Sequence, residues 1–176
     1  MADIVQRDNP ILRATAKAVD VKDIGSERIK SVISDMQKAM NSQKDGIAIA
    51  APQIGVSLRI FVISGHLLKL ADKSYKGDES DLIFINPKII KLSRNKNLVE
   101  EGCLSVRWYF GSIKRSDKAT ITAYNEKGEF IERGASGLLA QIFQHETDHL
   151  EGTLFIDHAK ELWEMNDEEI AAAQGK

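Results

Sequence analysis

The stretch Gln144-His145-Glu146-Thr147-Asp148-His149-Leu150-Glu151-Gly152 contains two histidines four residues apart, with a glutamate directly after the first. On an α-helix, positions i and i+4 lie about 40° apart around the axis and about 6 Å apart along it. His145 and His149 can therefore present two imidazoles to one cation, while Glu146 lies beside them and is free to carry a proton. The stretch predicts a metal site on a helix.

The helix that carries this motif is predicted to be capped by Ser136 and to end at Gly152. Apolar residues continue into the histidines at spacings of four, three and four, a rhythm typical of one helix face. This stripe consists of Leu138, Ile142, His145 and His149. The metal ligands are therefore expected to point into the protein interior.

The chain has 176 residues, of which 43% are hydrophobic and 28% charged, and we expect one compact domain over residues 1–176. A net charge of −2 argues against binding to nucleic acid or to an anionic membrane. The longest apolar runs, 60–63 and 82–85, are far too short to span a bilayer, and residues 1–4 lack the pattern of an export signal. We expect a cytoplasmic protein, and a monomer because no coiled-coil repeat is present. The single cysteine, Cys103, fits a reducing compartment.

The remaining elements are read from periodicity and turn residues, and they predict an α+β fold in which mainly antiparallel strands pack around the central helix. Helices are predicted after Asn9-Pro10, from Ser26 to about Gln43, and in an acidic C-terminal tail (159–176) from about Ala159 to Ala173. Strands are predicted at Leu58–Ser64, Leu82–Asn86 and Lys88–Ser93, with a hairpin formed by Thr120–Tyr124 and Glu129–Glu132. The polar stretch Gly65–Ser80 is predicted to be a surface loop.

A catalytic metal site of this type commonly has three protein ligands and one open position, so a third ligand is needed. A third histidine six residues after His149 is excluded, because Phe155 stands there. Glu168 or Glu169 lies at the distance of a downstream glutamate ligand, but within an acidic surface tail. Cys103 follows a glycine in Glu101-Gly102-Cys103-Leu104-Ser105, and a thiolate is a strong ligand. Beside a helix that lacks its third ligand, Cys103 is the favoured candidate.

At this point the chain resembles the peptide deformylases, whose three motifs are G-x-G-L-A-A-x-Q, E-G-C-L-S and Q-H-E-x-D-H-L-x-G. The corresponding stretches here are Gly46-Ile47-Ala48-Ile49-Ala50-Ala51-Pro52-Gln53, Glu101–Ser105 and Gln144–Gly152, in the same order and with matching spacing. The resemblance covers the chain from Asn9-Pro10 to about Ile156. It implies a hydrolase that removes the formyl group from the N-terminal formyl-methionine of newly made polypeptides and releases formate.

The resemblance also implies roles for individual residues. Cys103, His145 and His149 hold the divalent metal, and a metal-bound hydroxide attacks the formyl carbon. Glu146 acts as general acid and base. The oxyanion is held by the metal, the Gln53 side-chain amide and the Leu104 backbone N–H. Resemblance favours Fe(II) as the metal, although Zn(II), Ni(II) and Co(II) also suit this ligand set.

The resemblance further implies an apolar slot for the methionine side chain, and a peptide backbone that pairs with the chain like an added strand. The slot residues are Ile47, Val99, Leu138 and Ile142, and the pairing residues are Gly46, Ile47 and Ala48. The partners are N-formyl-methionyl nascent peptides, with transient proximity to the ribosome. Docking through a basic C-terminal helix is not expected, because from Ala159 onward the chain has five acidic and two basic side chains.

Two departures from the family pattern concern the peptide-binding region. Ala48 stands at the second glycine of the first motif, and Arg107-Trp108-Tyr109-Phe110 replaces a segment that commonly begins with proline. Two alternatives therefore stay open: a metallopeptidase that uses Glu168 or Glu169 as third ligand, and a non-catalytic binder of peptide N-termini on the same fold.

Overall fold

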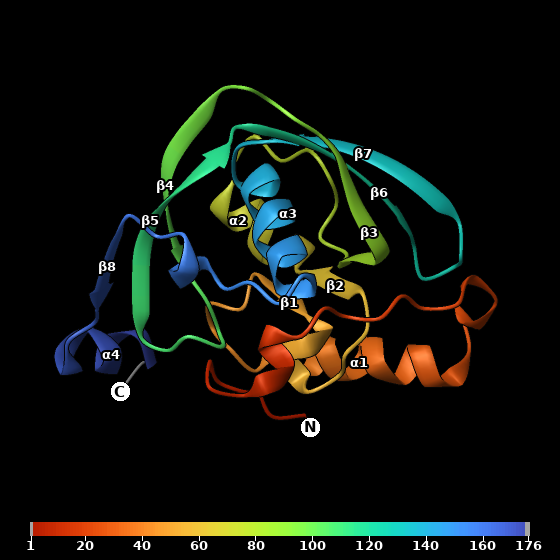
Figure 1. The fold of residues 1–176 in the computed structure, drawn as a ribbon, viewed down its shortest axis with the longest axis horizontal. Helices are drawn as coiled ribbons and strands as arrows, with labels where there is room; N and C mark the ends of the chain where they lie inside the picture. Colours follow the sequence, from red (N-terminus) through yellow and green to blue (C-terminus); the bar gives the residue numbers. More distant parts are fainter. Residues whose placement is uncertain (1, 175–176) are drawn as a thin grey trace.

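The fold places one helix, α3 (Gly137–Leu150), in the middle of the molecule, with strands on either side of it (Figure 1). A computed structural model describes residues 2–174, so the ends of the expected domain, residues 1 and 175–176, lie outside the described part. The other helices are α1 (Glu27–Asn41), α2 (Gly65–Ala71) and α4 (Asp167–Gln174). Short 3-10 turns are η1 (Pro10–Arg13), η2 (Val21–Asp23), η3 (Ala51–Ile54) and η4 (Phe155–Asp157).

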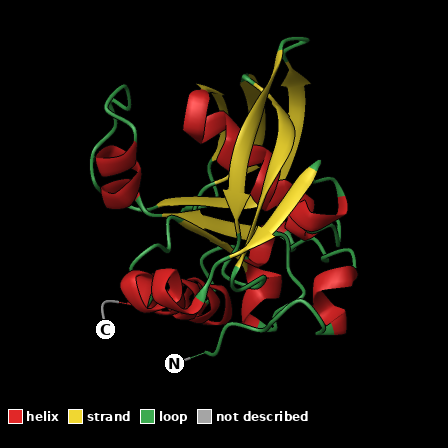
Figure 2. Cartoon of the chain, turned by 90° about the vertical axis from the view of Figure 1, so that its left-hand side faces the viewer, coloured by secondary structure: helices red, strands yellow, loops and turns green. Residues whose placement is uncertain are grey.

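Within residues 2–174, eight strands form two antiparallel sheets. The five-stranded sheet has the order β1-β2-β3-β6-β7, and the three-stranded sheet has the order β4-β5-β8. The strands are β1 (Ala48–Ala50), β2 (Ile60–Ile63), β3 (Leu82–Leu92), β4 (Lys96–Gly102), β5 (Tyr109–Ser116), β6 (Lys118–Tyr124), β7 (Phe130–Ser136) and β8 (Glu161–Glu164). A view turned by 90° shows the strands gathered together, with helical segments beside and below them (Figure 2). The α+β class and the central helix are confirmed.

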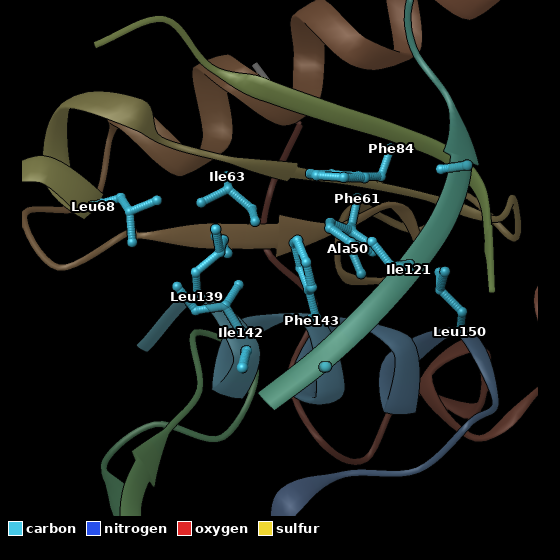
Figure 3. Packing of buried hydrophobic residues seen from close by; sticks show 14 of the residues in the cluster. Ala50, Phe61, Ile63, Leu68, Phe84, Ile121, Leu139, Ile142, Phe143 and Leu150 are labelled. Carbon is cyan, nitrogen blue, oxygen red and sulfur yellow. The ribbon is translucent and has the colours of Figure 1, made fainter. Parts of the chain in front are cut away.

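The largest part of the core lies between α3 and the five-stranded sheet. Phe143 on α3 is fully buried, and its ring lies 5.2 Å from that of Phe84 and 6.4 Å from that of Phe61. Figure 3 shows Leu139 and Phe143 of α3 pointing towards β2. Because this stripe of α3 is anchored in the core, the neighbouring stripe that carries the histidines is held in a fixed orientation.

The capping residues predicted from the sequence lie at the helix ends, and all but one of them act as expected. The Ser26 and Asn9 side chains accept hydrogen bonds from Ile29 N and Ile11 N, as expected of caps. Gly152 adopts φ +75°, and a Cβ there would lie 2.7 Å from the backbone of Arg13, so glycine is required after α3. Ser136 occupies the N-cap position of α3, but its side chain makes no cap hydrogen bond because the residue also ends β7.

The expected pair of strands on either side of Asn86-Pro87 is wrong, since β3 runs through both residues as one strand. Asn86 has a positive φ of 52°, and the register with β6 shifts between Ile85 and Lys88. The Asn86 side chain compensates by pairing with both backbone groups of Val19, at 2.8 and 2.7 Å. A bulge therefore accommodates the proline without ending the strand.

Two further expectations need correction. The Gly65–Ser80 stretch is not only a loop. It begins with the short helix α2, which Ser64 caps, and the side chain of Leu68 in this helix is fully buried. The C-terminal tail is not one helix from Ala159: β8 comes first, and α4 begins at Asp167. Residues 161–164 pair with β5, so a partner strand distant in sequence decides their structure. Among residues 2–174, no helix is long and apolar enough to cross a membrane.

The Phe143→Ala variant tests the central packing. Loss of a fully buried phenyl ring that contacts two other rings should lower the free energy of unfolding by about 3–5 kcal/mol. Urea denaturation measures this change. The matched control is Phe130→Ala, because Phe130 is 64% exposed and its loss should cost less than about 1 kcal/mol. Equal losses in the two variants would contradict this account of the core.

Candidate metal centre and active site

Three segments converge on the site, and each is held by a different part of the fold. The first is β1 with the η3 turn that follows it, at the edge of the five-stranded sheet. The second is the end of β4, at the edge of the three-stranded sheet, with the loop that follows Gly102. The third is α3, which contacts β1, β3, β5, β6 and β7. The site therefore lies between two sheet edges, against the central helix.

The structure brings Cys103, His145 and His149 together. One ligand atom from each residue lies within 4.8 Å of the other two, and Cys103 Sγ is 3.2 Å from His149 Nε2. Among the described residues, this is the group of cysteine, histidine or acidic side chains that is arranged to hold a metal ion. One thiolate and two imidazoles leave a fourth position open, which is the donor set of a catalytic divalent metal. The residues therefore fit such an ion.

Glu101 orients one of the histidines. Its Oε2 lies 2.8 Å from His145 Nδ1, a contact that suits a proton on Nδ1 and leaves Nε2 as the nitrogen that would bind a metal. The Glu101 side chain is only 3% exposed. Burial raises the pKa of this carboxyl group, but hydrogen bonds from Arg115 and His145 outweigh burial and hold the pKa at about 2. Glu101 is therefore a fixed negative charge behind the ligand.

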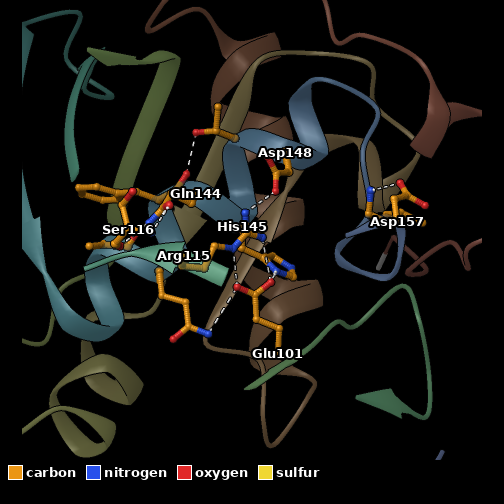
Figure 4. Close-up of polar contacts among 12 residues, drawn as sticks. Glu101, Arg115, Ser116, Gln144, His145, Asp148 and Asp157 are labelled. Atoms are coloured by element: carbon orange, nitrogen blue, oxygen red, sulfur yellow. Dashed lines mark hydrogen bonds and ion pairs between the residues drawn. The ribbon is translucent and has the colours of Figure 1, made fainter. Parts of the chain in front are cut away.

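Arg115 completes this arrangement as a two-sided ion pair (Figure 4). Its Nε and Nη2 donate to the two oxygens of Glu101 at 2.7 and 2.9 Å, and its Nη1 donates to Asp148 Oδ2 at 2.6 Å. Asp148 belongs to α3 and directly precedes His149. Burial lowers the pKa of Arg115, but the hydrogen bonds that Arg115 donates to Glu101 outweigh burial and raise the pKa above its ordinary value, so the guanidinium stays charged. The β4–β5 sheet is thus locked to the metal-binding helix.

The two histidines have opposite electrostatic surroundings. Burial lowers the pKa of His145, but the hydrogen bonds that it makes to Cys103 and Glu101 raise the pKa well above its ordinary value. Burial and the adjacent charge of His145 lower the pKa of His149 well below its ordinary value. His149 Nδ1 is also a buried nitrogen that has no hydrogen-bond partner. A neutral, buried imidazole of this kind is ready to donate its other nitrogen to a metal.

Glu146 lies buried in the same site, and its Oε2 has no hydrogen-bond partner. Burial raises the pKa of this carboxyl group to about 7, while the positive charge of His145 opposes the rise. A carboxyl group with this pKa can both accept and release a proton near neutral pH. The position has no structural use, because a buried, unpaired carboxylate is destabilising.

The two expected oxyanion donors come from opposite sheet edges. Gln53 is 1% exposed, and its Oε1 accepts from Ala50 N at 2.8 Å. Its amide nitrogen consequently faces the cluster, 3.5 Å from Cys103 Sγ and 3.2 Å from Ser105 Oγ. Leu104 directly follows the cysteine and is 7% exposed. Its carbonyl accepts from the Gln6 side chain at 3.1 Å, which fixes the peptide on that side.

A cavity of about 250 Å³ opens beside the cluster. Its lining includes most of the residues expected to contact substrate or metal: Ile47, Ala48, Gln53, Cys103, Leu104, Leu138, Ile142, His145 and Glu146. Gly46 lies one residue outside this lining, next to Asp45 and Ile47, which belong to it. Val99 does not line the cavity. It packs with Ile113 and Phe155, while Glu100, Glu101 and Gly102, later in the same strand, line the cavity.

The acidic tail does not reach the cluster. Glu168 and Glu169 lie exposed on α4, and Glu169 is engaged with the backbone of Asn166 at the start of that helix. A third ligand from this tail is therefore not supported.

Sequence reasoning assigned no role to Glu101, Arg115 or Asp148. Glu101 and Asp148 lie inside the recognised motifs, but their connection depends on the register of β4 with β5, a strand pair that was not predicted. One signal was available in the sequence. Ile113 and Arg115 share a strand face, and an arginine that follows an inward-facing isoleucine indicates a buried ion pair.

A cysteine, two histidines of which one is oriented by a carboxylate, and an unpaired buried glutamate are the residue types found in metal-dependent hydrolases. Comparison with known proteins gives the same class. Residues 1–164 match the family model described as polypeptide deformylase. The peptide deformylase of Pseudothermotoga lettingae is 43% identical over 149 residues, which cover 85% of this chain and 77% of that protein. The crystal structure of the Thermotoga maritima enzyme has a TM-score of 0.78 and 34% identity, and covers 92% of this chain and 99% of that one.

The chain belongs to the polypeptide deformylase family. A plant member, peptide deformylase 1A of Arabidopsis thaliana, is 40% identical over 164 residues and covers 89% of this chain. The chain spans only about 60% of the length of the two plant relatives, at 61% and 59%.

Metal analysis of two variants separates the candidate third ligands. The Cys103→Ser variant removes the thiolate and should not retain one divalent metal per chain after dialysis. A chain that ends at Asn166 lacks Glu168 and Glu169, and should retain it. Elemental analysis of both proteins measures the result, and the reverse pattern would contradict the assignment of Cys103.

The raised pKa of Glu146 predicts a pH-dependent stability in chelator-treated protein. Its ordinary pKa is 4.5, and its pKa in the folded state is about 7. Below pH 4.5 the carboxyl group is protonated in both states, and as pH rises towards 7 the unfolded state ionises first. Stability is therefore lost over that window, by roughly 3 kcal/mol in total. The Glu146→Gln variant should lack this loss, so urea denaturation should show it gaining on the parent between pH 5 and pH 8. A constant difference would argue against the raised pKa.

Proposed function

We propose that this chain hydrolyses the formyl amide at the N-terminus of formyl-methionyl peptides, in the reaction typical of its family, through the Cys103–His145–His149 site. The single observation that carries the proposal is the pairing of this metal-binding cluster with a buried carboxyl group, Glu146, whose pKa lies near neutral pH. Water adds to the formyl carbon, the C–N bond breaks, and formate and a free amine leave. Residues 1–176 act as one catalytic domain in this proposal.

Cys103, His145 and His149 hold one divalent metal. When bound, the metal supplies Lewis-acid chemistry and lowers the pKa of water to near neutrality. Glu101 keeps the His145 ring in the orientation that directs Nε2 towards the cluster. The softness of this donor set suits Fe(II), Zn(II), Ni(II) and Co(II). We propose Fe(II) as the metal in the cell.

Glu146 moves the proton. It accepts a proton from the attacking water and passes it to the leaving amine nitrogen, and a pKa of about 7 allows both transfers without a large energetic penalty. A protein that only bound peptide N-termini would have no use for a buried, unpaired carboxyl group at this position. The catalytic role is therefore favoured over the binding role.

Gln53 and Leu104 stabilise the negative charge that develops on the formyl oxygen. The Gln53 amide is already oriented by its bond to Ala50 N, so its N–H groups need no reorganisation during the reaction. The Leu104 N–H lies on the opposite side, next to Cys103. Gln53 and Leu104 together provide two hydrogen-bond donors to the formyl oxygen, one from each sheet edge.

The methionine side chain occupies the apolar part of the cavity, beside Ile47, Leu138 and Ile142. β1 lies at the edge of its sheet, and we place an extended peptide beside Gly46–Ala48. Ile47 is already paired through its N–H with Asp45 and through its carbonyl with Ser64, so Ala48 is the residue of this segment that can pair with the peptide. A related enzyme from Acinetobacter baumannii, with a TM-score of 0.78 and 28% identity, has been solved with bound Met-Ala-Ser. This peptide is consistent with a methionyl peptide ligand here. We propose that the protein works as a cytoplasmic monomer near the ribosome.

Formate release tests the proposal directly. Protein purified without oxygen and loaded with Fe(II) should release formate from formyl-Met-Ala-Ser. The Glu146→Gln variant should keep one metal per chain but lose about 10²–10⁴-fold in rate, because it cannot transfer the proton. A parent protein that binds metal stoichiometrically and releases no formate would refute the proposed function.

A further inference from the structure

Arg107 makes an ion pair that the catalytic chemistry does not use. Its Nη1 donates to Asp45 Oδ2 at 2.5 Å, and its Nη2 donates to Asp45 Oδ1 at 2.8 Å. Nη2 also donates to Gln43 Oε1 at 3.2 Å. The Arg107 side chain is only 17% exposed. A bidentate pair of this kind fixes the geometry of both partners as well as their charge.

The two partners belong to opposite walls of the peptide cleft. Asp45 directly precedes Gly46–Ala48, the segment on which the peptide backbone is expected to lie. Arg107 follows Cys103 and Leu104 on the loop that leaves β4. Asp45 and Arg107 both line the cavity, together with Ile47 on one side and Trp108 on the other. The ion pair therefore connects the β1 edge with the loop that carries the Leu104 N–H.

Each wall is rigid behind the ion pair. A Cβ on Gly46 would lie 2.3 Å from Met40 O, so this backbone is packed against the end of α1. On the other wall, Val106 N donates to Cys103 O at 3.0 Å, and Arg107 N donates to Gln6 Oε1 at 3.4 Å. The Arg107 guanidinium also lies 4.5 Å from the centre of the Trp108 ring. Gln53 links the two walls through Ser105 Oγ at 3.2 Å, and the Arg107–Asp45 ion pair is a second, charged link between them.

We propose that Arg107 is a positioning residue that, through Asp45, holds the two walls at the separation required by the peptide residues after methionine. This inference rests on the proposed function, because it assigns a role within the same cleft. The metal ligands, Glu146 and Gln53 make no contact with the Arg107 side chain in the hydrogen bonds described, so the chemistry at the formyl group is separate from this contact. Arg107 consequently affects long substrates and not the shortest one.

The experiment compares formyl-methionine amide, which ends before the cleft, with formyl-Met-Ala-Ser, which extends along it. Both are assayed with Fe(II)-loaded parent protein and with Arg107→Gln, Asp45→Asn and the double variant. Arg28→Gln is the matched control, because Arg28 is an exposed arginine on α1. For formyl-Met-Ala-Ser, each single variant should lower kcat/KM about tenfold through KM, with kcat changed less than about twofold. For formyl-methionine amide, kcat/KM should change less than about twofold.

The double variant should lose no more than either single variant, because both substitutions remove the same interaction. An equal loss with the two substrates would show a general structural role and would overturn the proposal, as would additive losses or no loss. If the parent protein releases no formate at all, the proposed function fails. Calorimetric binding of Met-Ala-Ser and of methionine amide then decides the role of Arg107. Weaker binding of the tripeptide alone by Arg107→Gln supports it, and unchanged binding of both overturns it.

Discussion

The buried carboxylate of Glu101 is the interaction on which the rest of the site depends. Its Oε2 lies 2.8 Å from His145 Nδ1, and its two oxygens accept hydrogen bonds from Arg115 at 2.7 and 2.9 Å. Arg115 in turn reaches Asp148 on the helix that carries both histidines. Burying these charges is costly in isolation, and the arrangement persists because each charge has a partner with good geometry. Removal of one partner would leave the others uncompensated next to the metal ligands.

This network explains how the proposed catalytic residues can come from such different parts of the chain. β1 and β4 are edge strands of separate sheets, and α3 fills the space between them. Gln53 follows the first edge, Leu104 follows the second, and the histidines lie on the helix between. The Glu101–Arg115–Asp148 contacts lock the second edge to α3, while the hydrophobic core anchors α3 to the five-stranded sheet. A hydrolytic centre can thus be rigid although its parts are distant in sequence.

The fold class and the helix of the metal motif could be predicted from the sequence because both are local signals. The i, i+4 spacing of His145 and His149 and the apolar stripe before them require only helical geometry. The strands β4 and β5 could not be predicted in the same way, since both contain many polar residues and the loop 103–108 that joins them is not a short hairpin turn. The side-chain direction of Val99 could not be predicted for a related reason. The direction of this side chain depends on the register of β4 with β5, and the neighbouring residues carry no sequence signal for that register.

The C-terminal tail illustrates the same limit. Its acidic, weakly amphipathic sequence indicated a helix from Ala159, yet residues 161–164 pair with β5. The available hydrogen-bonding edge of β5 outweighs the local preference. At the site, the carboxyl group of Glu101 was visible in the sequence, but its partners became clear only when β4, β5 and α3 were placed together.

The central claim is that Cys103, His145 and His149 hold one divalent metal ion. X-ray absorption spectroscopy of protein reconstituted with Zn(II) tests it most directly. The account predicts one sulfur ligand at about 2.3 Å and two imidazole nitrogens at about 2.0–2.1 Å, with a light atom in the fourth position. A ligand shell without sulfur, or one composed only of oxygen, would contradict it.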